Sequence, residues 1–338
     1  MNETEKDSMA RIVMGLGTSH SPLLTLEGSR WGERAADDLR NERLNLSDGR
    51  WVSYGQLAAE VDNRYAAVST EEHFIAKAKI CQNALDRIAN DLAAASPDVV
   101  VVVGDDQEEL FGLSNMPALS VFYGEEVVTH SREINGASPS WLPTVAKGYA
   151  MDDTHVFPGA PQLALDLIGG LIAHDVDVGA AAKVDDPRTA GFGHAYGFVV
   201  RRLFAGRSIP IVPVMLNTYY PPNVPTPARC YAIGRSLRAA IEDSPADLRV
   251  AIVASGGLSH FVVDEQLDRR VADALVKGDA DVLCSLPACA LNAGSSEIRN
   301  WILMAGAVEG MRNRWLEYQP LYRTPAGTGI GVAFGTWS

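Results

Sequence analysis

The chain has 338 residues, 47% of them hydrophobic, and carries 42 acidic against 29 basic side chains, giving a net charge of −13. This length and apolar content suffice to build the core of one large α/β domain. Because binding to nucleic acid or to an anionic membrane needs clustered cations, the acidic balance argues against both partners and favours a small molecule or another protein.

The N-terminal residues show no structural periodicity. Residues 1–10 are polar and acidic, so we expect them to form a disordered leader. They lack the apolar core of a signal peptide, and no later run approaches the length of a membrane span, which predicts a cytoplasmic protein. A first strand is expected over 11–16, and it leads directly into the motif Gly-Thr-Ser-His-Ser-Pro that contains His20.

A long segment separates this strand from the next one. Residues 21–94 are predicted to form a helical insertion that covers the active site as a lid. The prediction depends on apolar residues at helical spacing in its second half, namely Ile75, Ile80, Ala84, Leu85, Ile88 and Leu92. The alternative is that this segment adds helices to the core.

Apolar runs further along the chain predict the remaining strands. They occupy 97–103, 118–122, 176–182, 209–216 and 250–253, with helical segments between many of them. The glycine-rich tail is expected to pack near a pocket and to end in a short strand. No internal repeat or linker interrupts the pattern, so residues 11–338 are predicted to form a single α/β domain. Its central sheet is expected to be largely parallel or mixed and to be flanked by helices.

Three of the seven histidines lie beside glycines at or after the ends of predicted strands: His20, His194 and His260. Strand ends at one edge of an α/β sheet converge on a common crevice, so the three side chains are expected to share a site. Imidazole can serve there as a metal ligand, a proton donor or a base. Taken alone, His260 could instead cap the following helix, after a turn made by Gly256 and Gly257.

Several blocks of sequence contain these histidines or accompany them. They are Thr18–Pro22, Asp105–Phe111, Gly193–His194, Asn217–Pro222, Arg229–Gly234, Ser255–His260, Gly294–Trp301 and Thr324–Gly327. In content and order they resemble the class III extradiol ring-cleavage dioxygenases, the family of the protocatechuate 4,5-dioxygenase catalytic subunit. The resemblance runs from about Arg11 to the C-terminus. It is closest in type to the single-chain gallate and 3-O-methylgallate dioxygenases, with altered metal-ligand positions.

The resemblance implies cleavage of a catechol-, gallate- or protocatechuate-like ring with O2. In this family a non-haem Fe(II) is held by two histidines and one glutamate, with positions open for the substrate and O2. A nearby histidine takes the phenolic proton. By this resemblance His20 matches the first metal-binding histidine, His260 the catalytic acid/base, and His194 the histidine beside the substrate. A homodimer is possible in such a family.

Two metal-ligand positions depart from the family pattern. Gln107 stands where the second histidine belongs, and a neutral amide oxygen is a weaker donor to Fe(II) than imidazole. The expected Glu-x-Asp pattern begins with Gln266, and Glu265 lies one residue earlier. The expected metal ligands are therefore His20, Gln107 and Glu265, with Glu108 as a replacement for Gln107.

Two other functions stay open at this level. If no iron is held, His194 and His260 would suit a metal-independent C–C hydrolase, lyase or decarboxylase acting on a phenolic substrate. Such an enzyme would work without O2 and in the presence of chelators. The third possibility is a binding or regulatory subunit without turnover.

Four further residues are predicted to contact the substrate. Tyr219 and Tyr220 follow a predicted strand and could wall the pocket, although the loop could equally be a rigid element packed on the core. Arg188 lies close in sequence to His194 and could pair with a substrate carboxylate, with a surface ion pair as the alternative. Asp106 follows a strand and is expected to act in the site or to hold a turn.

Overall fold

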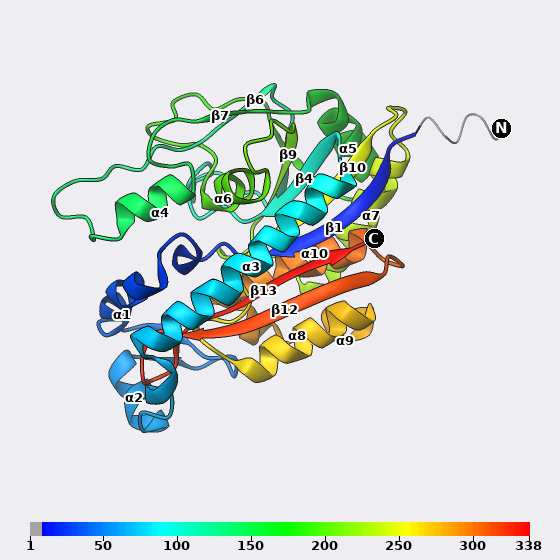
Figure 1. The fold of residues 1–338 in the computed structure, drawn as a ribbon. Helices are drawn as coiled ribbons and strands as arrows, with labels where there is room; N and C mark the ends of the chain where they lie inside the picture. The colour runs from blue at the N-terminus through cyan, green and yellow to red at the C-terminus, as the bar shows by residue number, and fades with distance from the viewer. Residues whose placement is uncertain (1–8) are drawn as a thin grey trace.

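In the computed structural model, which describes residues 9–338, nine strands form one mixed sheet (Figure 1). The strand order is β11-β13-β1-β10-β4-β9-β5-β8, and β12 pairs with β13. The strands are β1 (Arg11–Thr18), β4 (Val99–Gly104), β5 (Leu119–Phe122), β8 (Gly179–Ala181), β9 (Ile211–Leu216), β10 (Arg249–Ser255), β11 (His260–Val262), β12 (Asn313–Tyr322) and β13 (Thr328–Trp337). Two small hairpins pair β2 (Leu44–Asn45) with β3 (Trp51–Val52) and β6 (Glu126–Val128) with β7 (Val156–Pro158).

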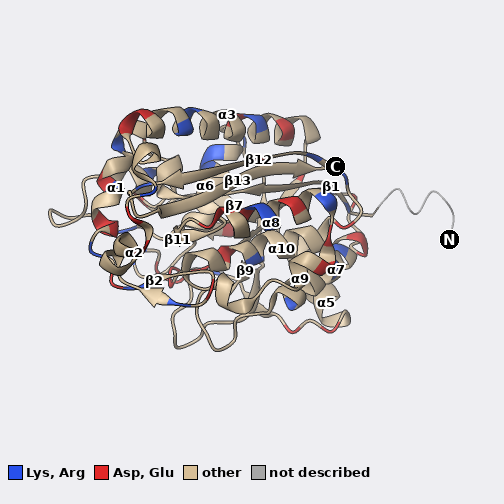
Figure 2. Ribbon diagram, turned by 90° about the horizontal axis from the view of Figure 1, so that it is seen from below, with Lys and Arg blue, Asp and Glu red and all other residues tan. Residues whose placement is uncertain are grey.

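Ten α-helices accompany the strands within residues 9–338. They are α1 (Trp31–Asp38), α2 (Tyr54–Val61), α3 (Glu71–Ala95), α4 (Leu142–Gly148), α5 (Pro161–Ala173), α6 (His194–Leu203), α7 (Pro227–Glu242), α8 (Glu265–Lys277), α9 (Ala280–Cys284) and α10 (Ile298–Ala307). Figure 2 shows α3 on one side of β12 and β13, and α8 and α10 on the other. None of the described helices combines the length and the apolarity needed to cross a membrane.

The central strands are parallel and buried on both faces. β10 lies between β1 and β4, and β4 lies between β10 and β9, all in parallel register. Alternate valines of β4 enter different cores: Val101 packs in the cluster that holds residues of α5, α7 and α10, whereas Val102 packs with residues of α3 and α6. Burying each such side chain contributes on the order of 2 kcal/mol. The predicted α/β fold with a mixed sheet is confirmed.

The predicted strands are present, but the run 176–182 contributes only the strand Gly179–Ala181, and β11 and β12 were not predicted; the ends of the chain also differ. The leader prediction falls mostly on residues 1–8, which lie outside the described residues; Ala10 is buried, and its N–H donates to the Ser244 carbonyl at 3.2 Å. The C-terminal strand is longer than expected, because β13 runs from Thr328 to Trp337 between β1 and β12. Gly331 allows its close packing, since an added Cβ would overlap the Asp268 carboxylate.

The segment predicted as a helical lid has two different roles. Its second half, α3, belongs to the core, because Leu85, Ile88 and Leu92 are fully buried against the sheet. The apolar spacing that predicts this helix also places those side chains on one face. The first half contains α1, whose Arg34 borders the central cavity described below.

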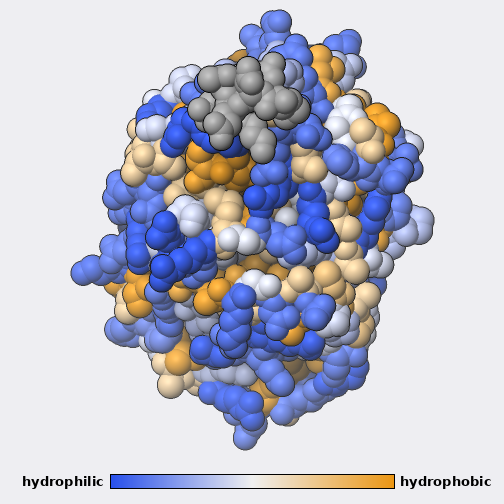
Figure 3. Space-filling view, turned by 90° about the vertical axis from the view of Figure 1, so that its right-hand side faces the viewer, coloured by the Kyte–Doolittle hydropathy of each residue, from blue (hydrophilic) through white to orange (hydrophobic). Residues whose placement is uncertain are grey.

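The exposed surface is largely polar and carries charges of both signs. Acidic and basic residues are interspersed along the exposed faces of the helices (Figure 2). The face in Figure 3 is mostly hydrophilic, and its hydrophobic residues form several separate groups.

Candidate active site

The three glycine-flanked histidines meet in one cavity at the edge of the sheet. His20 follows β1, His194 begins α6, and His260 begins β11. All three line a cavity of about 230 Å³, and the ring centroids of His20 and His194 are 4.6 Å apart. All three are buried. The structure therefore brings together the histidines that the sequence singled out.

The hydrogen bonds of His20 define its tautomer. Its Nδ1 lies 2.9 Å from Ser255 Oγ, and that hydroxyl donates its own hydrogen to the Ala195 carbonyl at 2.7 Å. Ser255 must therefore accept from His20, so the proton is on Nδ1. The Tyr149 hydroxyl also donates to the His20 carbonyl and fixes the backbone. The lone pair of Nε2 is thereby directed into the cavity.

The other two histidines are oriented in the same way. His194 Nδ1 lies 2.8 and 2.9 Å from the two carboxylate oxygens of Glu109, and His260 Nδ1 lies 2.8 Å from the Leu258 carbonyl. These partners only accept, so both rings are protonated at Nδ1. Burial alone would lower the pKa of His194, but the ion pair with Glu109 raises it to about 9.

The glycines beside the histidines have a steric function. A Cβ at Gly193 would overlap the Glu109 carboxylate, and a Cβ at Gly294 would overlap the His260 ring. Backbone must approach these groups closely, which only glycine allows. The glycine that flanks His194 is thus required by the site, whereas Gly294 packs on His260 from a distant part of the chain.

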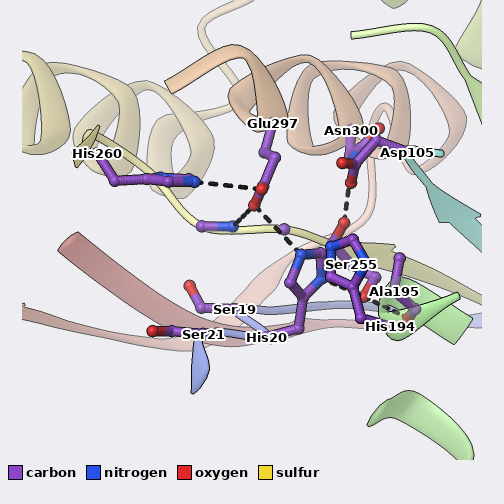
Figure 4. Close-up of polar contacts among 12 residues, drawn as sticks. Ser19, His20, Ser21, Asp105, His194, Ala195, Ser255, His260, Glu297 and Asn300 are labelled. Carbon is purple, nitrogen blue, oxygen red and sulfur yellow. Dashed lines mark hydrogen bonds and ion pairs between the residues drawn. The ribbon is translucent and has the colours of Figure 1, made fainter. Parts of the chain in front are cut away.

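Glu297 lies between two of the histidines (Figure 4). Its Oε2 is 3.4 Å from His20 Nε2 and its Oε1 is 3.2 Å from His260 Nε2, while the Gly257 N–H donates to Oε2 at 2.5 Å. The contact with His20 is not a hydrogen bond, because His20 Nε2 has no hydrogen-bond partner. Burial would raise the pKa of Glu297, but the hydrogen-bonded His260 imidazole holds it well below its ordinary value.

A second carboxylate, Asp105, completes the cluster. It follows β4, is fully buried, and accepts from Gln107 Nε2 at 3.1 Å and from Asn300 Nδ2 at 3.4 Å. Burial and the nearby Glu297 raise the pKa of Asp105. One ligand atom from each of His20, Asp105, His194 and Glu297 lies within 4.8 Å of the others, which is an arrangement that could hold a metal ion.

Neither Gln107 nor Glu265, the metal ligands expected from the sequence at the two altered positions, belongs to this cluster. Gln107 lines the cavity, but its amide donates to Asp105. Glu265 is the first residue of α8, outside the cluster; it pairs with Arg269 at 2.8 Å and accepts from the Tyr322 hydroxyl at 2.8 Å. The prediction that Glu265 binds the metal is therefore wrong. Because α8 begins at this residue, its carboxylate is directed toward a separate cavity.

The remaining alternatives for a metal ligand lie elsewhere too. Gln266 borders the same separate cavity as Glu265. Glu108 is exposed and has a left-handed φ of 60°, and it is near Tyr220 rather than in the cluster. Glu297, which sequence reasoning did not single out, takes the place between His20 and His260. The signal that could have found it was the matched block Gly294–Trp301, which contains this acid.

None of the four predicted substrate contacts lines the cavity. The Tyr219 and Tyr220 rings pack 5.2 Å apart in the loop after β9, and neither lines the cavity. Arg188 is exposed and pairs with Asp186 at 3.0 Å, which is the surface alternative. Asp106 accepts from the backbone N–H groups of three following residues, so its structural role is to hold a turn.

Three arginines that the sequence did not single out line the cavity instead. Arg323 is paired with the buried Asp38 at 2.7 and 3.0 Å. Arg34 pairs with Asp37 at 2.9 Å and also lies over the Trp141 ring. The third, Arg132, is half-buried, and within residues 9–338 its side chain makes no ion pair or hydrogen bond. Its guanidinium is therefore available to an anion.

The loop that carries His260 is held from behind by Asp268. This buried carboxylate accepts from Ser259 N–H at 2.7 Å, Ser259 Oγ at 2.8 Å and the Tyr318 hydroxyl at 2.7 Å. Burial raises the pKa of Asp268 to about 7, although the three hydrogen bonds oppose the shift. The Asp of the expected Glu-x-Asp pattern thus positions the catalytic loop.

This pKa shift predicts a pH-dependent stability. Because the folded-state pKa lies above the ordinary value of 3.8, stability from Asp268 is fully present below about pH 4 and is lost as the pH rises through about 7. Relative to an Asp268→Asn variant, which does not titrate, the wild type should lose about 4 kcal/mol of unfolding free energy over this range. Urea denaturation at several pH values measures the difference; a constant difference would contradict the prediction.

Comparisons with known proteins bear on this geometry. The profile of a family described as "Catalytic LigB subunit of aromatic ring-opening dioxygenase" matches residues 65–333. Gallate dioxygenase of Pseudomonas putida is 36% identical over 134 residues, which cover 37% of this chain and 38% of that protein. The 2,3-dihydroxyphenylpropionate/2,3-dihydroxicinnamic acid 1,2-dioxygenase of Mycobacterium ulcerans is 26% identical over 200 residues, covering 58% of this chain and 55% of that protein. The chain therefore spans about half or less of the length of these relatives.

Proposed function

The chain belongs to the family of the catalytic LigB subunit of aromatic ring-opening dioxygenases, and we propose that it opens a catechol-like ring by extradiol cleavage with Fe(II) and O2. The names of the two relatives support a phenolic substrate. The observation that carries the proposal is the buried cluster around Glu297, with three histidines directing Nε2 into one cavity. The homodimer and the cytoplasmic location stay predictions from the sequence.

The donor set fits a divalent first-row metal. His20 Nε2 is buried, carries its lone pair toward the cavity and has no hydrogen-bond partner, and the Glu297 carboxylate lies beside it. Imidazole and carboxylate are ligands suited to Fe(II), so His20 and Glu297 would hold the ion. When bound, iron would supply the activation of the catechol and of O2 that ring opening requires.

His260 supplies the acid/base function in this proposal. Its Nε2, which is hydrogen-bonded to Glu297 Oε1 at 3.2 Å, is the ring atom that can exchange a proton with the substrate, because Nδ1 is already committed to the Leu258 carbonyl. Burial would lower the pKa of His260, but the Glu297 carboxylate raises it, so the protonated ring is stabilised after proton uptake. The same proton is then available to a later intermediate or to the product.

His194 is suited to donate a hydrogen bond to the substrate. The Glu109 carboxylate stabilises the imidazolium form, in which Nε2–H is directed into the cavity. A positive donor at this point would stabilise negative charge that develops on a substrate oxygen. Together, His194 and His260 would hold and move protons at a substrate bound in this cavity.

The guanidinium of Arg132 in the cavity, unpaired among the described residues, predicts that the substrate carries a negatively charged carboxylate. We expect Arg132→Leu to raise KM about 10- to 100-fold for a catechol that carries a carboxylate, with kcat little changed, because a charge-assisted hydrogen bond would be lost. Arg188→Leu is the matched control, since that arginine is exposed and lies outside the cavity. The interpretation would be wrong if KM for a catechol without a carboxylate rose by the same factor.

Oxygen consumption tests the proposed function directly. Protein purified without oxygen is loaded with Fe(II) and mixed with catechol, gallate or protocatechuate in an oxygen electrode, while absorbance follows the ring-opened product. We expect one O2 to be consumed for each ring that is opened, and strong chelators to abolish the reaction. Turnover that survives chelators and consumes no O2 would instead support the metal-independent lyase; no turnover with ligand binding would support a binding subunit.

A further inference from the structure

We propose that this chain holds its metal with one histidine and two carboxylates, His20, Asp105 and Glu297, in place of a set of two histidines and one glutamate. The inference rests on the proposed function only in assuming that a metal is bound. It assigns a ligand role to Asp105, which neither the sequence pattern nor the family resemblance indicates. Gln107 then becomes a residue that orients Asp105.

The position of Asp105 supports this assignment. It follows β4, which lies in the middle of the sheet between β10 and β9, so the fold holds its backbone on both sides. The side chain is fully buried, and a ligand atom of its carboxylate lies within 4.8 Å of those of His20 and Glu297. In Figure 4 Asp105 is drawn beside Asn300, close to the His20 and Glu297 pair.

The charge around this cluster points to a cation. Asp105 and Glu297 are both buried, and among residues 9–338 no lysine or arginine forms an ion pair with either of them, although the imidazoles of His20, His194 and His260 lie near the two carboxylates. Two buried carboxylates at this separation repel each other unless a positive ion or a proton lies between them. A divalent ion bound by both would remove that repulsion, and the bare Nε2 of His20 would complete its ligands.

Gln107 has a defined part in this arrangement. Its Nε2 donates to one oxygen of Asp105 at 3.1 Å, and Asn300 Nδ2 approaches the other oxygen at 3.4 Å. Such outer hydrogen bonds orient a ligating carboxylate. The Gln107 side chain is therefore assigned to orienting Asp105 rather than to the metal.

This ligand set has a chemical consequence. One neutral nitrogen and two carboxylates balance the charge of a divalent ion, whereas two histidines and one carboxylate leave it one unit positive. Oxygen-rich sites favour harder ions such as Mn²⁺ relative to Zn²⁺. We therefore expect the ratio of Mn²⁺ to Zn²⁺ affinity to depend on residue 105.

Metal titration without substrate or O2 tests the assignment. Calorimetry with Mn²⁺ is done on the metal-free wild-type chain and on Asp105→Asn, Gln107→Ala and Glu265→Gln. We expect Asp105→Asn to weaken Mn²⁺ binding by about 100-fold, Gln107→Ala by about tenfold, and Glu265→Gln not at all. Equal affinity of Asp105→Asn and the wild type, or a larger loss in Gln107→Ala than in Asp105→Asn, would overturn the proposal.

A second variant keeps the test independent of folding defects. Asp105→His should still bind metal but should shift the Zn²⁺ to Mn²⁺ affinity ratio toward Zn²⁺ by about tenfold, because imidazole replaces a carboxylate. An unchanged ratio would contradict the assignment. The proposed function is judged by a different outcome. If Mn²⁺ binding depends on Asp105 but no catechol is opened, the ligand assignment stands and the proposed function fails. If an Asp105→Asn variant keeps wild-type metal affinity and O2-dependent ring opening, only the ligand assignment fails.

Discussion

Replacing His260 by alanine is expected to slow ring opening about 10²- to 10⁴-fold, the range that a general acid/base contributes. The reason is that His260 Nε2 is the cavity nitrogen that can take the phenolic proton, with Glu297 placed 3.2 Å away to stabilise the charged ring. Single-turnover absorbance changes in iron-loaded protein measure the rate. Because His260 is not assigned as a ligand, the Mn²⁺ affinity of the variant should stay within about threefold of the wild type.

Two controls separate proton transfer from other effects of this substitution. His73→Ala, in the first turn of α3 and outside the cavity, should leave the rate unchanged. A substrate whose hydroxyl groups are more acidic should recover part of the lost rate in His260→Ala, because less proton transfer is required. If the variant opens rings at the wild-type rate, or if its loss is explained entirely by lost metal, His260 is not the acid/base residue.

Much of the fold could be predicted because its strands are buried on both faces. The valine run of β4 and the β-branched run of β10 have no polar residue to alternate with, which is the pattern of covered parallel strands. Their pairing with each other places the residues after them at one edge of the sheet. The histidines were found by the same logic, because their glycine neighbours mark close approaches of backbone.

The missed residues reach the site by routes that local pattern does not encode. Glu297 is 37 residues from His260 in sequence, and a 3-10 turn at Ala293–Glu297 brings it to the cavity just before α10 begins. The sequence pattern expected after His260 pointed to Glu265 instead. The direction of that side chain depends on the residue at which α8 begins, and sequence alone does not fix a helix start to one residue. Arg132 lies in a loop, where no periodicity shows which way a side chain points.

Replacing Glu297 by glutamine is expected to have the largest effect of any single change in the site. The amide keeps the size of the side chain but removes the charge that faces His20 at 3.4 Å and His260 at 3.2 Å. A neutral amide is also a weak metal ligand. We therefore expect metal affinity to fall about 100-fold and ring opening to fall by more than about 10³-fold, since the ligand and the partner of the acid/base are lost together.

Metal analysis of the purified protein, together with O2 uptake, measures both effects. The matched control is Glu265→Gln, which removes a carboxylate that pairs with Arg269 outside the cavity and should change neither quantity. Adding excess Fe(II) to Glu297→Gln should restore metal but not full activity, because His260 still lacks the carboxylate that raises its pKa. Full metal content and wild-type turnover in Glu297→Gln, with losses in Glu265→Gln, would return the ligand role to Glu265, where the sequence pattern first placed it.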